Sequence, residues 1–171
     1  SRIKNDPAFQ RTRENGAEFG RAGRAGKVLR TAFRSLSLNA ADSRMASRLT
    51  QLMMKVIKAD AVSNRGLRNV LDGEAELLAG FEFNISGKFG NTLYAPFSSS
   101  IDRAAGTIDL EIPVFSPLTM LAAPEGTTHF KIVSAATFFR PSLTIACAKT
   151  VAVVVPSPAK SLVLEATSFT I

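Results

Sequence analysis

The segment GAEFGRAGRAGKVLR, at residues 16 to 30, has the residue types best suited to holding an anion. It contains four glycines and four cations within fifteen residues, and bare glycine backbone beside guanidinium groups can cradle a phosphate. A nucleotide-binding P-loop, however, requires G-x-x-x-x-G-K-[ST] after a strand. Here Gly26-Lys27 is followed by Val28, and Arg21 occupies the position of the first glycine. A GxGxxG motif does not occur either, so the segment is not predicted to be a nucleotide loop.

Few other residues offer chemistry. The chain has one histidine, His129, and one cysteine, Cys147, so a Cys/His zinc site within one chain and an internal disulfide are both excluded. No nucleophile motif accompanies His129, and Cys147 lies in an apolar stretch typical of a buried thiol. Asp109 and Glu111 share one face of a predicted strand and could bind a cation weakly, or be a solvated face. We therefore predict no enzyme, no cofactor and no small-molecule substrate.

Charge divides the chain into two regions. Residues 1 to 70 carry a net charge of +10, residues 71 to 171 carry −3, and together they give the overall +7. Eleven of the fifteen N-terminal cations are arginine. A hydrophobic content of 46% is enough for a real core, and no apolar run is long enough to cross a bilayer. The asymmetry predicts two regions with different roles.

The first region is predicted to be an antiparallel helical hairpin. Asp6 can cap a helix that Pro7 begins and that runs to about Leu38, with a break among the glycines as an alternative. After a turn, Asp42 or Ser43 can cap a second helix ending near Ala59. Its apolar residues recur at helical spacing, namely Met45, Leu49, Leu52, Met53, Val56 and Ile57.

A helical wheel sorts the first helix into two faces. At about 100° per residue, one arc is apolar and contains Phe19, Ala22, Ala25, Leu29, Ala32, Phe33 and Leu36. The opposite arc is basic and contains Arg13, Arg24, Lys27, Arg30 and Arg34 together with Gly16, Gly20 and Gly23. Gly26 lies at the edge of the apolar arc. The glycines could form a close-contact face for another helix, the cations could bind a phosphate or nucleic acid, or the arc could simply be solvated.

From Phe81 onward the hydrophobic period changes to two, which is typical of strands. Alternation predicts strands around residues 108–112, 130–135, 143–147, 151–155 and 162–167, separated by prolines. We predict an α+β protein: a basic helical hairpin at 1–62, a connecting segment at 63–80, and an antiparallel β-sandwich at 81–171, Ig-like or jelly-roll-like. The chain ends within an apparent strand, so we expect the sandwich to be incomplete there.

The stretch IKNDPAFQRTRENGAEFGRAGRAGKVLRTAFR, with SRLTQLMMKVIKAD and LLAGFEFN after it, resembles a family of uncharacterised proteins common in Bacteroidota. The resemblance is close over residues 2 to 85 and looser beyond. Members of that family carry a β-hairpin segment before this motif and a further apolar strand pair after the point where this chain ends. The resemblance therefore implies that this chain is a fragment, and it implies no activity, cofactor or catalytic residue.

Two functional hypotheses follow from these features. The first is a non-enzymatic structural or assembly protein that self-associates, as a component of an appendage, filament, shell or phage-like particle. Glycine-lined close contact and unpaired terminal strands favour a homo-oligomer or an assembly with related subunits. The second is a nucleic-acid-binding protein that uses the arginine-rich helices. The lack of aromatic residues among those arginines argues against stacking on a single strand.

Overall fold

The computed structural model describes residues 2–38, 41–102, 104, 107–134, 137–138, 146–147 and 151–156. The chain divides into two compact units. One comprises Ser1–Ile85 with Phe138–Ala146, and the other comprises Ser86–Thr137 with Cys147–Ile171. Each unit is described by itself below.

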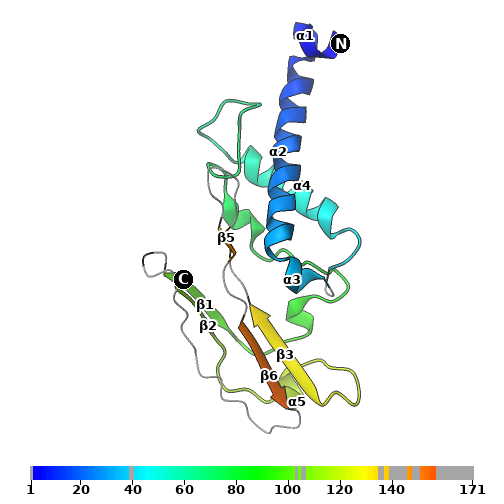
Figure 1. Cartoon of the computed structure of the whole chain (residues 1–171), viewed down its shortest axis with the longest axis vertical. Helices are drawn as coiled ribbons and strands as arrows, with labels where there is room; N and C mark the ends of the chain where they lie inside the picture. Colours follow the sequence, from blue (N-terminus) through cyan, green and yellow to red (C-terminus); the bar gives the residue numbers. More distant parts are fainter. Residues whose placement is uncertain are drawn as a thin grey trace. The chain divides into compact units, whose positions relative to one another are not determined.

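The first unit is built on one long helix. Helix α1 (Arg2–Asn5) and the 3-10 turn η1 (Pro7–Phe9) lead into α2 (Gln10–Ala32), which continues without a break through all four glycines. Asp6 caps η1, where its carboxylate accepts a hydrogen bond from the Ala8 N–H at 2.9 Å, whereas α2 itself begins after Phe9 without a side-chain cap. The helix ends earlier than expected, at Ala32, and a separate turn, α3 (Arg34–Ser37), follows. Figure 1 shows α2 as the longest element of this unit.

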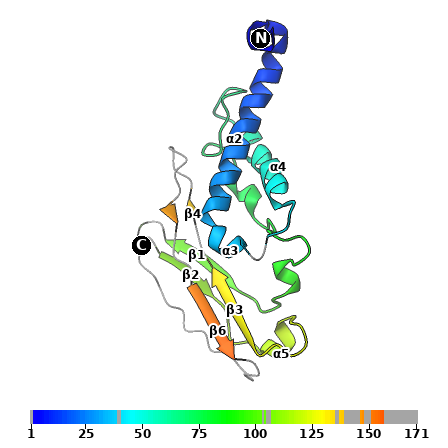
Figure 2. The ribbon, with the colours of Figure 1, turned by 45° about the vertical axis from the view of Figure 1, so that its right-hand side comes forward.

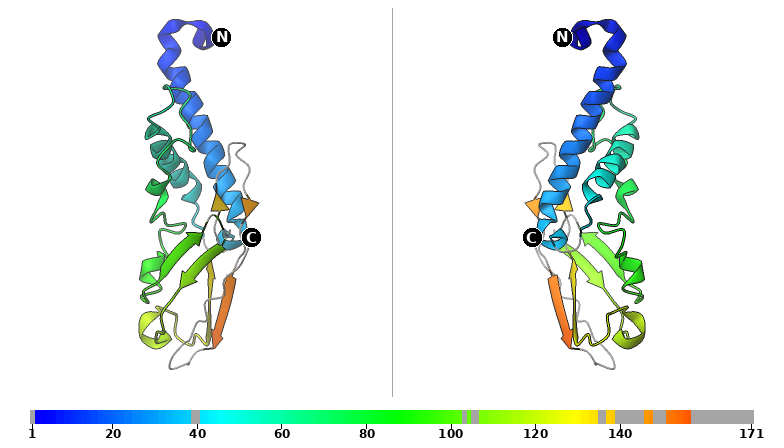
Figure 3. Two further views of the ribbon diagram at one scale, coloured as in Figure 1. Left: turned by 90° about the vertical axis from the view of Figure 1, so that its left-hand side faces the viewer. Right: turned by 90° about the vertical axis from the view of Figure 1, so that its right-hand side faces the viewer.

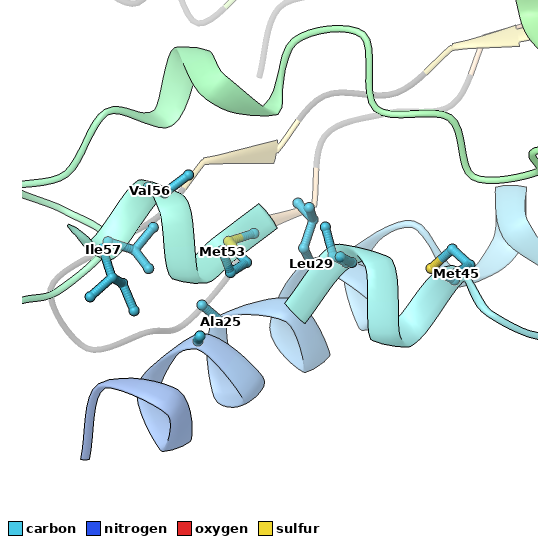
Figure 4. Close-up of a cluster of buried hydrophobic side chains, with 9 residues drawn as sticks. Ala25, Leu29, Met45, Met53, Val56 and Ile57 are labelled. Atoms are coloured by element: carbon cyan, nitrogen blue, oxygen red, sulfur yellow. The ribbon is translucent and has the colours of Figure 1, made fainter. Parts of the chain in front are cut away.

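Helix α4 (Met45–Lys58) packs along α2 in the opposite direction (Figure 3), and the predicted apolar stripe is confirmed except at Leu52, which is half-buried and outside the core cluster. Its residues Leu49, Met53, Val56 and Ile57 are fully buried. Each such side chain contributes about 1.5–3 kcal/mol relative to its exposed state. From α2 the cluster receives mostly small side chains, which allow the two helices to approach closely. Those residues are Ala22, Ala25 and Leu29, and several members of the cluster are labelled in Figure 4.

A loop region between residues 60 and 85 completes this unit. It includes the 3-10 turn η2 (Ala75–Leu78). Phe81 and Phe83 pack against the helical cluster, and their rings meet edge to face at 5.4 Å. The Phe83 ring also meets that of Phe33 at 6.0 Å. The aromatic residues at which the sequence changes to a period of two therefore belong to the core of the helices.

The second unit contains short strands and little helix. After the 3-10 turn η3 (Phe89–Asn91), β1 (Ser98–Asp102) and β2 (Thr107–Glu111) form an antiparallel hairpin. The short helix α5 (Pro117–Met120) precedes β3 (His129–Ser134), which pairs antiparallel with β6 (Val151–Pro156), as Figure 2 shows. The small hydrophobic core of this unit contains the buried side chains of Leu93, Ala95, Ile112 and Phe115.

The predicted β-sandwich is wrong for the part of the chain that the structure describes. The strands form separate pairs, β1–β2, β3–β6 and the two-residue strands β4 (Thr137–Phe138) and β5 (Ala146–Cys147), rather than two packed sheets. The physical reason lies in the prolines. Pro113, Pro117 and Pro124 remove backbone donors from a stretch that would have to supply central strands, and this stretch holds α5, turns and isolated bridges at Phe115 and Leu121 instead. The strand predicted at residues 162–167 lies outside the described residues.

Candidate interaction surface

Helix α2 keeps its basic arc on the outside. Arg24, Lys27 and Arg34 are all exposed, and none of their side chains forms an ion pair or hydrogen bond with another residue that the structure describes. The ion pairs of the described residues involve arginines of other segments, such as Arg48 and Arg68. The three exposed cations therefore leave a positive potential on this side of α2.

Two predicted members of the basic arc have structural partners. The Arg13 guanidinium donates to the carbonyl oxygens of Ile3 and Asp6, at 2.8 Å in both cases. It thereby ties the N-terminal turns to α2. The Nε of Arg30 donates to the carbonyl of Gly26 within its own helix at 3.4 Å. Arg13 is consequently less suited than Arg24 or Lys27 to contact a partner, because it would first have to release two carbonyls.

The glycines of α2 differ in their surroundings. A Cβ added at Gly16 or Gly23 would meet no described atom within 4 Å, and one at Gly20 would meet only the Arg24 guanidinium at 3.6 Å. The glycine that faces α4 is Gly26, whose added Cβ would lie 3.6 Å from Cγ of Leu49. Gly16, Gly20 and Gly23 thus form an open strip of backbone, and their contact with another helix stays a prediction.

Phe19 lies beside this open strip, contrary to the prediction that it faces the core. Its side chain is 60% exposed. Its neighbours on the helix surface, three residues before and four after, are Gly16 and Gly23. We call Phe19, Gly16, Gly20 and Gly23, with Arg24, Lys27 and Arg34, the open face of α2. It combines an exposed aromatic ring, uncovered backbone and cations.

The buried side of α2 near Phe19 is polar, which explains the ring's position. Glu18 is 1% exposed, and its carboxylate accepts hydrogen bonds from the Gly66 N–H at 2.8 Å and from Nε of Arg68 at 2.9 Å. Arg21 donates back to the Gly66 carbonyl. Helix α4 has ended at Lys58, so a polar loop covers this half of α2 and leaves no apolar surface for Phe19.

The sequence prediction missed Glu18, although a signal was present. Its position falls at about 140° on the same wheel, in the middle of the arc that holds Ala22 and Leu29. A charged residue at the centre of an apolar arc indicates a buried ion pair.

Two aspartates fix the loops around the helices. Burial raises the pKa of Asp60, but hydrogen bonds from the backbone of Ser63 and Asn69, from the Ser63 hydroxyl and from the Val62 N–H outweigh this and lower the pKa to about 2. The backbone N–H of Ile85 is the main reason that the pKa of Asp42 lies below its ordinary value, with Arg44 and Arg48 adding to it. Both carboxylates are structural anchors that a pattern of hydrophobicity does not reveal.

A shallow surface depression lies at the start of α2. It has a volume of about 520 Å³ and is lined by Pro7, Ala8, Gln10, Arg11, Glu14 and Arg65. Glu14 pairs with Arg65 at 3.4 Å and accepts from Gln10 at 2.9 Å. Because this carboxylate offsets one of the two cations, the depression holds little net charge for an anion.

The other sequence candidates are separate from the open face along the chain. His129 is exposed at the start of β3, and its Nδ1 lies 3.0 Å from the Thr128 hydroxyl. Asp109 and Glu111 lie on β2, opposite Ser100 and Ser98 of β1. Among the residues that the structure describes, no three His, Cys, Asp or Glu side chains gather to hold a metal. None of the described helices has the length and apolar character to cross a membrane.

Comparisons with protein-family models, with curated proteins and with solved structures find no match.

Proposed function

We propose that this protein is a non-enzymatic structural or assembly component that acts through protein–protein contacts and associates with further copies of itself. The supporting observation is the open face of α2, where the exposed Phe19 ring lies between glycines that no described atom covers. Each glycine costs about 1 kcal/mol relative to alanine in a helix interior. A protein that keeps Gly16 and Gly23 uncovered gives up helix stability at positions where a partner backbone could approach closely.

Sedimentation velocity over about a hundredfold range of protein concentration tests this proposal, since association depends on mass action. Wild-type protein should show a rising sedimentation coefficient. Gly23→Leu should weaken the association, because its side chain would occupy the space of the partner, while it raises the helix propensity of α2. The matched control is Gln51→Leu, an exposed position of α4 outside the open face, and it should associate like wild type. A wild-type monomer at every concentration would contradict the proposal.

A second candidate function, binding of a nucleic-acid backbone, is favoured by the exposed cations Arg24, Lys27 and Arg34. Three phosphate contacts predict a slope of about −3 in a plot of log K against log salt for duplex DNA. The triple change of these residues to glutamate should abolish that binding. A triple variant that binds as tightly as wild type, or a wild-type protein that does not bind, would exclude this function.

A further inference from the structure

The open face of α2 is poorly suited to pack against its own copy, because its charges are all positive. Arg24, Lys27 and Arg34 of one copy would face the same three cations of another in a two-fold symmetric contact. Like charges brought together at an interface oppose association. If the protein assembles, as proposed above, the partner of this face should therefore be a different and acidic surface of the second copy.

The second unit carries such a surface on the β1–β2 hairpin. Leu110 packs against the small core of this unit, so its neighbours Asp109 and Glu111 lie on the opposite face of the strand. Glu111 is exposed and Asp109 is half-buried. Their cross-strand partners, Ser98 and Ser100, are small and polar. Neither carboxylate has an ion-pair partner among the described residues.

The spacing of the two sets of charges is compatible. Arg24 and Lys27 are separated by three residues of helix, a rise of about 4.5 Å along the axis, and their long side chains extend that reach. Asp109 and Glu111 are two residues apart on a strand, which separates them by about 7 Å. Two cations can therefore meet two carboxylates at once.

We propose that the open face of α2 in one copy binds the Asp109–Glu111 face of the β1–β2 hairpin in a second copy. The inference rests on the proposed self-association and specifies its geometry. The contact joins two different surfaces, so it is heterologous and leaves one surface of each kind available at the ends. Such contacts propagate into open chains, or into rings where the rotation closes.

Two charge-reversed variants of the full chain test this geometry. The first carries Arg24→Glu with Lys27→Glu, and the second carries Asp109→Lys with Glu111→Lys. Each variant alone would bring like charges together, and its association constant should fall at least about tenfold. In an equimolar mixture each reversed surface meets an opposite one, so association should return toward the wild-type value. Nucleic acid is removed from all samples beforehand, and sedimentation velocity is the measurement.

Matched controls keep the outcomes distinct. Arg44→Glu with Lys55→Glu makes the charge change of the first variant at two exposed positions, just before α4 and within it. Glu74→Lys with Glu76→Lys makes the charge change of the second variant just before η2 and within it. Both controls should associate like wild type. Reversed variants that associate normally, or a mixture that stays dissociated, overturn the heterologous geometry while leaving self-association standing. A wild-type protein that is monomeric would contradict the proposed function itself. Circular dichroism checks that every variant is folded, and a folded variant makes each outcome decisive.

Discussion

Replacement of Glu18 tests whether the polar anchor beneath α2 stabilises the first unit. In Glu18→Ala the Gly66 N–H and the Arg68 guanidinium lose their common acceptor. An unsatisfied buried donor and a lost charge-assisted hydrogen bond each cost about 1–3 kcal/mol. Arg68 reduces this cost, because its side chain is 21% exposed and its Nη1 still donates to the Lys58 carbonyl at 3.1 Å. The expected loss in the free energy of unfolding is about 3 kcal/mol.

The charge-removing change Glu18→Gln separates charge from hydrogen bonding. The amide oxygen can still accept from the Gly66 N–H, so a smaller loss of about 1–2 kcal/mol is expected. The control is Glu14→Gln on the same helix, whose partner Arg65 is 43% exposed at a distance of 3.4 Å. A pair of that kind contributes at most about 1 kcal/mol. Urea denaturation followed by far-ultraviolet circular dichroism gives all three values.

The comparison between the two glutamines is the decisive result. If Glu18→Gln and Glu14→Gln lower the free energy of unfolding equally, burial of Glu18 does not strengthen its contacts, and the reasoning is refuted. An unchanged dependence on urea concentration would show that the variants unfold from the same native state.

Other substitutions test the packing of the first unit and the loss of its stability at low pH. Gly73→Ala should destabilise the first unit by about 3 kcal/mol, because the new Cβ would lie 2.3 Å from the Val56 carbonyl oxygen, and urea denaturation measures it. Gly16→Ala should act in the opposite direction and stabilise α2 by up to about 1 kcal/mol, which a thermal melt would detect; a loss of stability would mean that something already covers this glycine. The folded-state pKa of Asp60, about 2, lies below its ordinary 3.8, so its contribution is complete above about pH 4 and is lost as the pH falls toward 2. Asp60→Asn should therefore lose less of its free energy of unfolding than wild type over that pH interval, as measured by urea titrations at successive pH values. A variant that loses as much as wild type would rule out this role of Asp60.

The helices could be predicted from sequence because their signals are local. The stripe from Met45 to Ile57 repeats at the period of an α-helix, and Asp6-Pro7 carries a cap and a first turn within two residues. The positions of Ala22, Ala25 and Leu29 in the core followed from the same periodicity. For the site, the wheel correctly put Arg24, Lys27 and Arg34 on the exposed side of α2.

The β-sandwich prediction was wrong because alternation of apolar and polar residues predicts strands without predicting their partners. The alternation around Ile108 and Leu110 did give a strand, but its partner β1 contains the run Ser98-Ser99-Ser100, in which no apolar alternation is visible. Pairing of β3 with β6 joins residues that are 17 to 27 positions apart. Such pairing depends on the whole chain, and a window of ten residues contains no information about it.

Sequence alone therefore determined the charge asymmetry, the two helices and the separation of a basic arc from an apolar one, since composition and helical period are properties of short segments. Tertiary structure determined which residues contact each arc of α2. Glu18 is buried because Gly66 and Arg68, about fifty residues away along the chain, supply donors. Phe19 is exposed because α4 ends before it could cover that ring. The glycines between the arginines, by contrast, lie on the arc opposite Ala22 and Leu29, so their exposure follows from the helical period.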